Sequence, residues 1–471
     1  MQHEIVNIQS FLYLIWPGLL YISYVLGVFL AFLFVVQILR SPRIPSATIG
    51  WLFAIIFAPF IGIPLYLIFG VRKLNSRIKL KSKMNLPDTI DTHHHPINSL
   101  LVSLGIPSSS GDNLVGFHKD GETAYHDLLL LLDCAKQAID ISMFMLSNDY
   151  VGRAILFHLE NKAAQGVRVR LLLDGVGSFF LPKKRLQTLI KNGGRVAWFI
   201  PVLHHPLRGR TNLRNHRKIV IADHDKVWTG GRNLAAEYLG PNCSNTCWID
   251  MSFCQQGSSV FTYQAIFEAN WHFATNTYSD CMIDYPQSAS NGNSRVQVVP
   301  SGPDVADDPI YAAVLTAFYG AKDHIFIITP YYIPDAGVQE ALRLAALRGV
   351  AVDLVLPGKS NHRLADIARN RYLRELAESG VRIRIIPDTM IHAKVFVVDK
   401  TLAMAGSANF DIRSLFLDYE VMNCFYSKHD IDWLIRWIES LSDRSINYHP
   451  RPVGIFKEIV EGLVLLIAYQ L

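Results

Sequence analysis

Two short stretches of this sequence present the same chemically active residue types at the same spacing. Both read H-x-K-x-x-x-x-D, and their defining residues are His216, Lys218 and Asp223 in the first copy and His392, Lys394 and Asp399 in the second. In each copy an apolar run of strand-forming residues separates the lysine from the aspartate. Side chains two positions apart on a strand point to the same face, so each copy is predicted to bring an imidazole and an ammonium group to one place.

The likeness between the two copies extends beyond the motif. Both continue at equal spacing to a turn of small residues and an asparagine, Asn233 in the first copy and Asn409 in the second. A single copy of the motif arises by chance in roughly a few per cent of chains, so one copy alone would be a weak signal. Ordinary half-buried strands with a solvated His and Lys would not be expected to share these tails. The pair therefore predicts one site in which two histidines and two lysines surround an anion.

The composition of the 471-residue chain indicates membrane segments. Half of the residues are hydrophobic and only 18% are charged, which is low for a soluble enzyme. The net charge of +5 suits an anionic partner without identifying it. Six cysteines are scattered along the chain, and the C-x3-C pair Cys243 and Cys247 lacks the further ligands that a zinc site requires. We therefore expect unpaired, inert thiols in a reducing compartment.

Two apolar runs near the N-terminus are long enough to cross a bilayer. They cover residues 11–39 and 47–69, and each exceeds the roughly 20 residues that a membrane-spanning helix needs. Pro59 and Pro64 interrupt the second run, so a kinked or re-entrant helix is an alternative there. The first run lacks the basic start and the small-residue cleavage site of a signal peptide.

Basic residues predict how these runs are oriented in the membrane. Six lysines and arginines lie between residues 72 and 83, after the second run, against two arginines in the turn between the runs. The positive-inside rule therefore places the C-terminal part in the cytoplasm, with the N-terminus on the same side. The basic strip is also suited to lie on anionic lipid headgroups.

The rest of the chain divides into a linker, two similar halves and an apolar tail. We expect a membrane region over 1–83, a polar linker over 84–111, repeats over 112–290 and 291–454, and a final apolar segment over 455–471. In each half, helical patterns alternate with Val- and Leu-rich strands, which is typical of an α/β fold with a largely parallel sheet. Two equivalent halves suggest a pseudo-twofold axis with both motifs at the interface. The final segment is predicted either to dip into the membrane interface or to pack on the core as a terminal helix.

Further segments extend the pattern beyond the duplicated motifs. They are LDGVGS at 173–178, PYYIPD at 330–335 and GSANFDIRS at 406–414. With the motifs and the apolar N-terminal runs, they resemble the phospholipase D superfamily, and within it the bacterial cardiolipin synthases of the two-motif type. The resemblance covers nearly the whole chain. It implies two tandem phospholipase D-type α/β repeats that form one pseudo-twofold catalytic unit, preceded by two N-terminal transmembrane helices.

The motif residues suit chemistry on a phosphodiester, which resists attack because it is anionic. Lys218 and Lys394 would neutralise charge that builds on the nonbridging oxygens in the transition state. Amide donors from Asn233 and Asn409 would assist them. One neutral histidine would attack phosphorus while the other, protonated, donates to the departing alcohol, so the two imidazoles must titrate apart. This chemistry requires no metal and no other cofactor.

The resemblance also assigns supporting roles to four acidic residues. Asp250 and Glu420 would each fix the ring of a histidine through the nitrogen remote from phosphorus. Asp223 and Asp399 would brace the motifs without touching substrate. Ser407 stands where the first half has a glycine, and its hydroxyl would either bind phosphate or complete the turn.

By resemblance, the reaction moves a phosphatidyl group from one phosphatidylglycerol to a second and releases glycerol, which gives cardiolipin. The resemblance favours His216 as the nucleophile, whereas the residues alone leave either histidine open. A hydrolytic phospholipase D with water as acceptor is the alternative. A nucleic-acid phosphodiesterase would be expected to lack the membrane runs and to carry a more basic surface. We therefore expect a protein of the bacterial inner membrane with an anionic phospholipid substrate, no nucleic-acid partner and an undetermined oligomeric state.

Overall fold

The computed structural model describes residues 2–40, 45–70, 84–87, 93–201, 212–243, 247–277 and 292–465. Its internal contacts divide the chain into two compact units. One unit comprises residues 1–72 with 203–212, and the other comprises 73–202 with 213–471. The first unit holds the N-terminal helices, and the second holds both H-x-K-x-x-x-x-D motifs.

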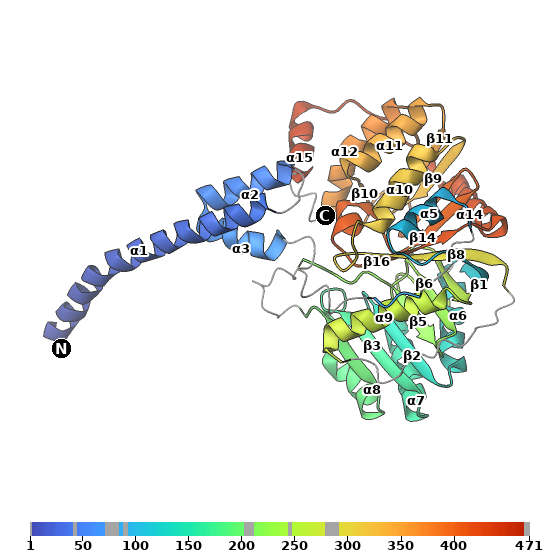
Figure 1. Cartoon of the computed structure of the whole chain (residues 1–471), viewed down its shortest axis with the longest axis horizontal. Coiled ribbons are helices and arrows are strands. Elements are labelled where there is room, and N and C mark those ends of the chain that lie inside the picture. Colours follow the sequence, from blue (N-terminus) through green and yellow to red (C-terminus); the bar gives the residue numbers. More distant parts are fainter. Residues whose placement is uncertain are drawn as a thin grey trace. The chain divides into compact units, whose positions relative to one another are not determined.

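In the described residues of the N-terminal unit there are three helices: α1 (Gln2–Leu39), α2 (Pro45–Phe57) and α3 (Pro59–Phe69) (Figure 1). Over Tyr21–Leu39, α1 is long and apolar enough to cross a membrane, and the part of the chain that the structure describes holds one such helix. The second apolar run, expected as a span or as a kinked or re-entrant helix, consists of two shorter helices. At about 1.5 Å per residue, neither reaches alone across a hydrocarbon core of about 30 Å.

The break between α2 and α3 follows from the local sequence. Ala58 has a non-helical backbone with φ of −140°, and Pro59 starts the next helix, as proline does at a first helical position. The chain then turns so sharply that a Cβ on Gly62 would lie 2.3 Å from the carbonyl oxygen of Ala54, so only glycine fits there. Tyr66 of α3 packs edge-on against one ring of α1 and one ring of α2, which ties the three helices together.

The second unit contains two sets of strands and helices that follow each other along the chain. The first half consists of β1 (Ser110–His118), α6 (Gly121–Cys134), β2 (Ala138–Met143), α7 (Tyr150–Ala164), β3 (Arg168–Asp174), the 3₁₀ turn η1 (Lys183–Leu186), α8 (Gln187–Lys191), β4 (Arg195–Phe199), β5 (Ile219–Ala222), β6 (Lys226–Gly230), β7 (Ser252–Gln256) and α9 (Val260–Thr275). The second half consists of β8 (Ser294–Ser301), α10 (Pro309–Gly320), β9 (His324–Ile328), β10 (Tyr332–Ile333), α11 (Ala336–Leu347), β11 (Ala351–Pro357), α12 (Arg363–Glu378), β12 (Arg382–Ile386), β13 (Val395–Val398), β14 (Leu402–Gly406), β15 (Phe410–Asp411), α13 (Ile412–Phe416), β16 (Glu420–Phe425), α14 (Lys428–Ser440), the 3₁₀ turn η3 (Ser442–Arg444) and β17 (Ile446–Asn447). Two further helices flank these halves: α5 (Pro96–Ser103) and α15 (Ile455–Leu465).

The described strands form one main sheet whose order is nearly symmetrical about its centre. From edge to edge the order is β17-β12-β11-β9-β13-β14-β16-β8-β1-β7-β6-β5-β2-β3-β4, while β10 and β15 form a separate small pair. At the centre β1 pairs antiparallel with β8, and outward from them each strand except the edge strand β17 has its counterpart in the other half (Figure 1). The halves expected from the sequence are therefore two α/β repeats joined edge to edge. The expectation of a largely parallel sheet is wrong, because parallel pairing is confined to β2-β3-β4 and β9-β11-β12 and the other described neighbours in the main sheet pair antiparallel.

The strand that follows each His–Lys pair is buried on both faces. In β5, Ile219 and Ile221 pack with α9, whereas Val220 and Ala222 pack with α6 and α7. Alternate residues of β13 divide in the same way between α14 and the helices α10, α11 and α12. The apolar runs inside the motifs are continuous because helices cover both faces of these strands.

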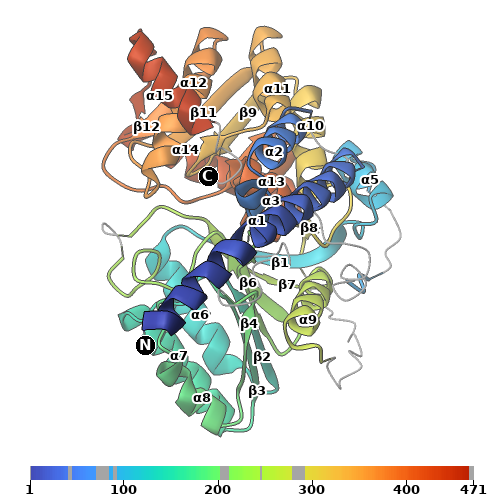
Figure 2. The ribbon, with the colours of Figure 1, turned by 90° about the vertical axis from the view of Figure 1, so that its left-hand side faces the viewer.

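One helix lies inside the stretch that the sequence presents as a polar linker. α5 buries Ile97 and Leu101 in the same core as α10. At its N-terminus, Nδ1 of His95 accepts a hydrogen bond from the backbone N–H of Ile97 at 3.2 Å. At the other end of the chain, α15 lies beside α12 in both views (Figures 1 and 2). The helix that precedes the two halves, α5, and the helix that follows them, α15, therefore help to cover the second half.

Candidate active site

Both His–Lys pairs lie where a strand begins. β5 starts one residue after Lys218 and β13 one residue after Lys394, so each pair occupies the segment that leads into its strand rather than the strand itself. Nζ of Lys218 lies 2.6 Å from the carbonyl oxygen of His216, and Nζ of Lys394 lies 2.7 Å from Nδ1 of His392. Besides burial, the charges of both lysines lower the pKa of His216. The structure therefore brings the two pairs together in one cluster.

Each of the two histidines is held by an acid from the opposite half. Nδ1 of His216 lies 2.9 Å from Oε1 of Glu420, the first residue of β16 in the second half. Nδ1 of His392 lies 2.6 Å from Oδ2 of Asp250, which precedes β7 in the first half. Both acids proposed from the resemblance thus contact a histidine, but across the interface between the halves.

Backbone pairing across the interface fixes this exchange. The segment before each histidine forms an isolated parallel bridge with the segment before the opposite acid, Asn215 with Tyr419 and Ile391 with Ile249. The backbone N–H groups of the two histidines donate to the carbonyl oxygens of Tyr419 and Ile249 at 2.9 and 2.7 Å. Because a hydrogen bond at Nδ1 fixes an imidazole ring, Nε2 is the atom of each ring left to meet substrate. Neither half holds a complete site by itself.

The two acids differ in length, and the residues that face them differ accordingly. A Cβ on Gly231 would lie 2.2 Å from Oδ1 of Asp250, so a serine does not fit there. The longer Glu420 leaves room for Ser407, whose hydroxyl donates a hydrogen bond to its Oε2. This contact with the orienting acid is neither of the two roles considered for Ser407 from the sequence.

Burial and the lysine charges set the protonation of the two acids. Burial raises the pKa of Glu420 to about 7, against the opposing charge of the nearby lysine. Burial alone would also raise the pKa of Asp250, but the charges of Lys394 and His392 hold it below its usual value. At neutral pH, His392 therefore faces an ionised carboxylate, whereas His216 faces one that is about half protonated. The two imidazoles have different electrostatic partners.

The lysines and asparagines complete the polar lining of the cluster. Burial lowers the pKa of Lys218 to about 7 and that of Lys394 to about 8. Two ammonium groups beside one ionised acid favour an anionic ligand such as a phosphodiester. The side chain of Asn409 donates to Oγ of Ser414 at 3.1 Å, and that of Asn233 hydrogen-bonds Tyr238. These contacts hold both asparagines beside the cluster.

The aspartates that close the motifs lie at the far ends of β5 and β13. Asp223 accepts hydrogen bonds from the backbone N–H groups of residues 136–138 at 2.8, 2.7 and 3.0 Å. Asp399 accepts the equivalent bonds from residues 322–324 at 2.7, 2.8 and 2.9 Å. Each carboxylate ties its motif to the start of a neighbouring strand, β2 or β9, and so contacts the framework of the site rather than its centre.

Aromatic rings against the histidines were missed by the sequence reasoning. Phe144 packs edge-on against His216, and Tyr238 packs edge-on against His392, each with ring centroids 5.0 Å apart. The ring centroid of Trp248 lies 5.8 Å from that of His392. Only 12% of the His216 side chain and 5% of the His392 side chain remain exposed. In the sequence nothing distinguishes these rings from core aromatics, because their role depends on the fold.

The segment that carries Asp250 begins at a disulfide between Cys243 and Cys247. The expectation of unpaired thiols is therefore wrong for this pair, although Cys134, Cys254 and Cys424 are free. C-x3-C spacing alone does not separate a disulfide from two thiols, because the backbone between the cysteines decides whether they meet.

Arg217, inside the first motif, links the two halves. Its guanidinium donates at 3.0 Å to the carbonyl oxygens of Glu420 and Ser301 and to Oδ1 of Asn270. Asp304 lies 3.4 Å from the same group, and both side chains of this ion pair are fully buried. The second motif has Ala393 at this position, so the sequence alone indicates only that the two motifs have diverged. In the structure it fixes the backbone of the residue that holds the first histidine.

Arg217→Met is expected to destabilise the chain by about 3–5 kcal/mol, because it breaks a fully buried ion pair with Asp304 and three hydrogen bonds to residues of both halves. Arg371→Met is the matched control, since the Arg371 side chain is 60% exposed and its pair with Glu375 is of the surface kind that contributes about 0–1 kcal/mol. Thermal unfolding of both variants, purified in the same detergent, measures the difference. Equal unfolding temperatures would contradict the linking role of Arg217.

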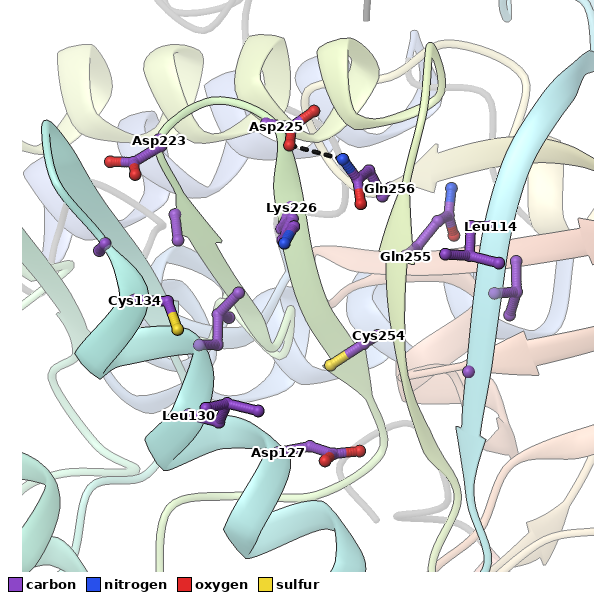
Figure 3. Close-up of a pocket in the computed structure, with 15 residues that line it drawn as sticks. Leu114, Asp127, Leu130, Cys134, Asp223, Asp225, Lys226, Cys254, Gln255 and Gln256 are labelled. Carbon is purple, nitrogen blue, oxygen red and sulfur yellow. Dashed lines mark hydrogen bonds between the residues drawn. The ribbon is translucent and has the colours of Figure 1, made fainter. Parts of the chain in front are cut away.

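A cavity of about 530 Å³ lies in the first half, between α6 and the strands β1, β6 and β7 (Figure 3). Asp127 lies at one end of this cavity, and Asp223 and Asp225 lie at the other end (Figure 3). Lys226 and Cys254 line the part between them. The cavity adjoins the Asp223 end of β5, whereas the histidine precedes the other end of that strand. Neither histidine lines it, and we assign it no part in the reaction.

His118, Asp127 and Cys254 combine the residue types of a metal site within the described part of the chain, with ligand atoms no more than 4.8 Å apart. Nε2 of His118 already lies 3.1 Å from Oδ2 of Asp127. Burial and the nearby charge of Arg232 lower the pKa of His118 to about 3, and the same guanidinium would repel a bound cation. This group lies apart from the catalytic cluster, whose chemistry we expect to need no metal.

Comparison with protein families matches both halves to one model. Residues 128–271 and 314–442 match a family described as "Cardiolipin synthase, PLD-like domain". Residues 29–70 match a second family, described as "Phospholipase_D-nuclease N-terminal". The first pair of regions contains both His–Lys pairs and both orienting acids, and the second lies in the N-terminal helices.

Individual relatives cover most of the chain. A cardiolipin synthase of Listeria monocytogenes is 33% identical over 443 residues, which cover 88% of this chain and 90% of that protein. The major cardiolipin synthase of Bacillus subtilis is 32% identical over 434 residues, which cover 87% and 89%. The crystal structure of a phosphatidylserine synthase from Haemophilus influenzae superimposes with a TM-score of 0.60 over 79% of this chain and 97% of that chain. At 14% identity, this last match shows a shared fold.

Proposed function

Since this chain belongs to the phospholipase D-like family of cardiolipin synthases, we propose that its two motifs transfer a phosphatidyl group from one phosphatidylglycerol to another. The chain is a phosphatidyltransferase, and the products of this reaction are cardiolipin and glycerol. The observation that carries the proposal is the exchange of acids between the halves. It holds two imidazoles with free Nε2 atoms beside two buried lysines, which is the arrangement that a two-step transfer at phosphorus requires.

In the first step, Nε2 of neutral His216 attacks the phosphorus of the donor lipid. The phosphorus–oxygen bond to glycerol breaks, and protonated His392 gives its Nε2 proton to the departing oxygen, so glycerol leaves as a neutral alcohol. The acids support this division of roles. Burial and the charge of Lys394 lower the pKa of His392 to about 3 in the free chain, so its imidazolium form requires ionised Asp250 together with the bound anionic phosphodiester. Glu420, whose pKa is raised by burial, favours a neutral His216.

In the second step, a glycerol hydroxyl of another phosphatidylglycerol occupies the place of the released glycerol. His392, now neutral, accepts the hydroxyl proton while the oxygen attacks phosphorus. The phosphorus–nitrogen bond to His216 breaks, cardiolipin forms, and both imidazoles return to their starting protonation states. Lys218 and Lys394 stabilise charge on the nonbridging oxygens in both steps.

Transfer to an alcohol requires that water be kept from the phosphohistidine. The rings of Phe144, Tyr238 and Trp248 cover the imidazoles, and this cover supports transfer over hydrolysis. If water nevertheless enters, the same residues form phosphatidic acid, which is the reaction of a hydrolytic phospholipase D. Product analysis separates the two reactions.

We place the protein in the bacterial inner membrane, with its catalytic unit on the cytoplasmic side, where the Cys243–Cys247 pair would be kept reduced. The apolar helix α1 supports attachment to the membrane, and the basic residues between 72 and 83 support the orientation. The two-span arrangement requires α2 and α3 to cross the bilayer together. If they instead form a re-entrant pair, α1 is the one span and the N-terminus lies on the opposite side.

The decisive experiment follows lipid products and glycerol from the purified full-length chain in phosphatidylglycerol vesicles that contain a chelator. Cardiolipin and glycerol in equal amounts, lost in His216→Ala and in His392→Ala, are the expected result. Phosphatidic acid without cardiolipin would show that water is the acceptor. Activity that survives either substitution would overturn the assignment of the site.

The pH dependence of kcat/KM should report the lysines of the free enzyme. Because burial lowers the pKa of Lys218 to about 7 and that of Lys394 to about 8, the charged forms are lost as pH rises through this range. A neutral lysine does not stabilise the anionic phosphodiester, so kcat/KM should fall above about pH 7, whereas kcat should fall at higher pH because bound phosphate retains the protons. Initial rates in mixed micelles measure both parameters, and a flat kcat/KM through this range would contradict the assignment.

A further inference from the structure

The C-terminal helix α15 exposes an apolar face that the catalytic cluster does not explain. Ile455, Phe456, Ile459 and Leu463 are 77%, 81%, 54% and 60% exposed. At about 100° per residue, these four side chains fall within about 100° of the helix circumference. Single exposed apolar side chains are ordinary on protein surfaces, but four on one face of a helix indicate a binding surface.

The opposite face of α15 fixes the helix to the second half. Glu461 is 1% exposed and forms two hydrogen bonds with Arg374 of α12, at 3.2 and 2.5 Å. Val464 and Leu465 pack against the core that α10, α11 and α12 share. The final segment was expected either to dip into the membrane interface or to pack on the core. In α15, the inner face packs on the core, and the outer face does not. The apolar face points outward from a helix that is held in place.

Cationic side chains border one side of the apolar face, and the exposed Glu458 lies on the other side. A cavity of about 320 Å³ beside α15 is lined by Arg374, Arg451 and Lys457, among others, and its described lining includes no carboxylate. Lys457 belongs to α15 itself and follows Phe456 directly. Arg451 and Lys457 take part in none of the ion pairs between described residues, so their charges are available to an anion.

We propose that α15 docks onto an anionic lipid bilayer, with its apolar face in the headgroup–acyl boundary and the neighbouring cations at lipid phosphates. An apolar helix face bordered by Lys and Arg is the pattern of helices that lie in the plane of a membrane. Positive charge at its border is drawn to anionic headgroups. In a twofold contact between two copies of the chain, the cations of one copy would face the same cations of the other and repel them. The charges therefore favour a bilayer as the partner. This surface is separate from the motifs, and its assignment does not depend on the roles given to the histidines.

Spin labels on the full-length chain in bilayers test the proposal. In a Cys134→Ser, Cys281→Ser background, single cysteines at Phe456, Ile459 and Leu463 carry a nitroxide. Collisions with oxygen, which concentrates in lipid, and with a water-soluble nickel chelate report the depth of each label. Glu458→Cys on α15 and Leu130→Cys on α6 are matched controls, since Leu130 is a 61% exposed leucine on another helix.

Labels at the three apolar positions should show several-fold fewer nickel collisions than the controls and many oxygen collisions in phosphatidylglycerol bilayers. The double variant Arg451→Gln, Lys457→Gln, or bilayers of phosphatidylcholine alone, should reduce the measured depth. Nickel collisions equal to those of Leu130 would show that the face lies in water and would overturn the proposal. Low collisions with both reagents, with dipolar broadening between labels of two copies, would assign the face to a protein partner instead. None of these readouts requires that cardiolipin be formed.

Discussion

His392→Ala is expected to release one equivalent of p-nitrophenol rapidly from phosphatidyl-p-nitrophenol and then to stop, whereas His216→Ala is expected to release none. p-Nitrophenol departs without a proton from a general acid, so the first step then needs only the nucleophile. The second step still needs His392 as the base for the acceptor hydroxyl, so the phosphatidyl group remains on His216. Rapid-mixing absorbance measures the burst, and peptide mass spectrometry locates the phosphohistidine.

With phosphatidylglycerol as donor, both variants should lose cardiolipin formation by roughly 10⁴-fold or more, because the leaving glycerol needs the acid as well as the nucleophile. His126→Ala is the control, since His126 is exposed on α6 and lies outside the cluster. A burst in His216→Ala and none in His392→Ala would reverse the two roles while leaving the overall reaction in place.

Asp250→Asn is expected to reduce kcat/KM more than Glu420→Gln, by roughly 10³-fold against roughly tenfold. An amide in place of Asp250 removes the negative charge that stabilises the imidazolium form of His392. Glu420 is about half protonated at neutral pH because burial raises its pKa to about 7, so a neutral amide there changes less. Rates of cardiolipin formation in mixed micelles measure both losses.

The loss of activity caused by Glu420→Gln should also depend on pH. Burial and the lysines keep His216 neutral in either state of Glu420, but an ionised Glu420 stabilises the positive charge that forms on His216 when Nε2 bonds to phosphorus. Glu420 ionises as pH rises through about 7, so the ratio of native to variant rates should grow above that pH. The ratio for Asp250→Asn should stay constant there, because the pKa of Asp250 lies below the usual value. The control variant Glu340→Gln, at a surface pair with Arg343, should form cardiolipin at the native rate across the same pH range. Equal and pH-independent losses in the two site variants would contradict the difference between the acids.

The duplicated motif predicted the main architecture because it carries two independent patterns. The spacing of the His–Lys pairs indicated a shared site, and the apolar run after each pair indicated a strand. The structure shows why that run is continuous, since Ile219 and Val220 meet helices on opposite faces of the sheet. The resemblance supplied Asp250 and Glu420, but which histidine each one contacts depends on the backbone bridges between the halves. No pattern within one half encodes that pairing.

Other features escaped prediction for identifiable physical reasons. α5 reads as polar linker because its buried apolar residues are few, Ile97 and Leu101 beside the buried polar Asn98, and the core that holds them belongs to the distant α10. The second apolar run was only partly missed, since Pro59 and Pro64 already indicated a kinked or re-entrant helix, and Ala58 and Pro59 divide the run into α2 and α3. Arg217 reads as a variable position because its acceptors come from both halves of the chain.

The exchange of acids between the halves also bears on how the protein is made. A ribosome completes the first half, with His216, Lys218 and Asp250, before it has synthesised Glu420. Until the second half folds, His216 lacks its contact with Glu420, and Asp250 lacks its contact with His392. A partly synthesised chain at the membrane therefore has no assembled nucleophile with which to cleave the lipids around it. On the proposed assignment of His216 and His392, the geometry that builds the site therefore delays lipid cleavage until both halves have been made.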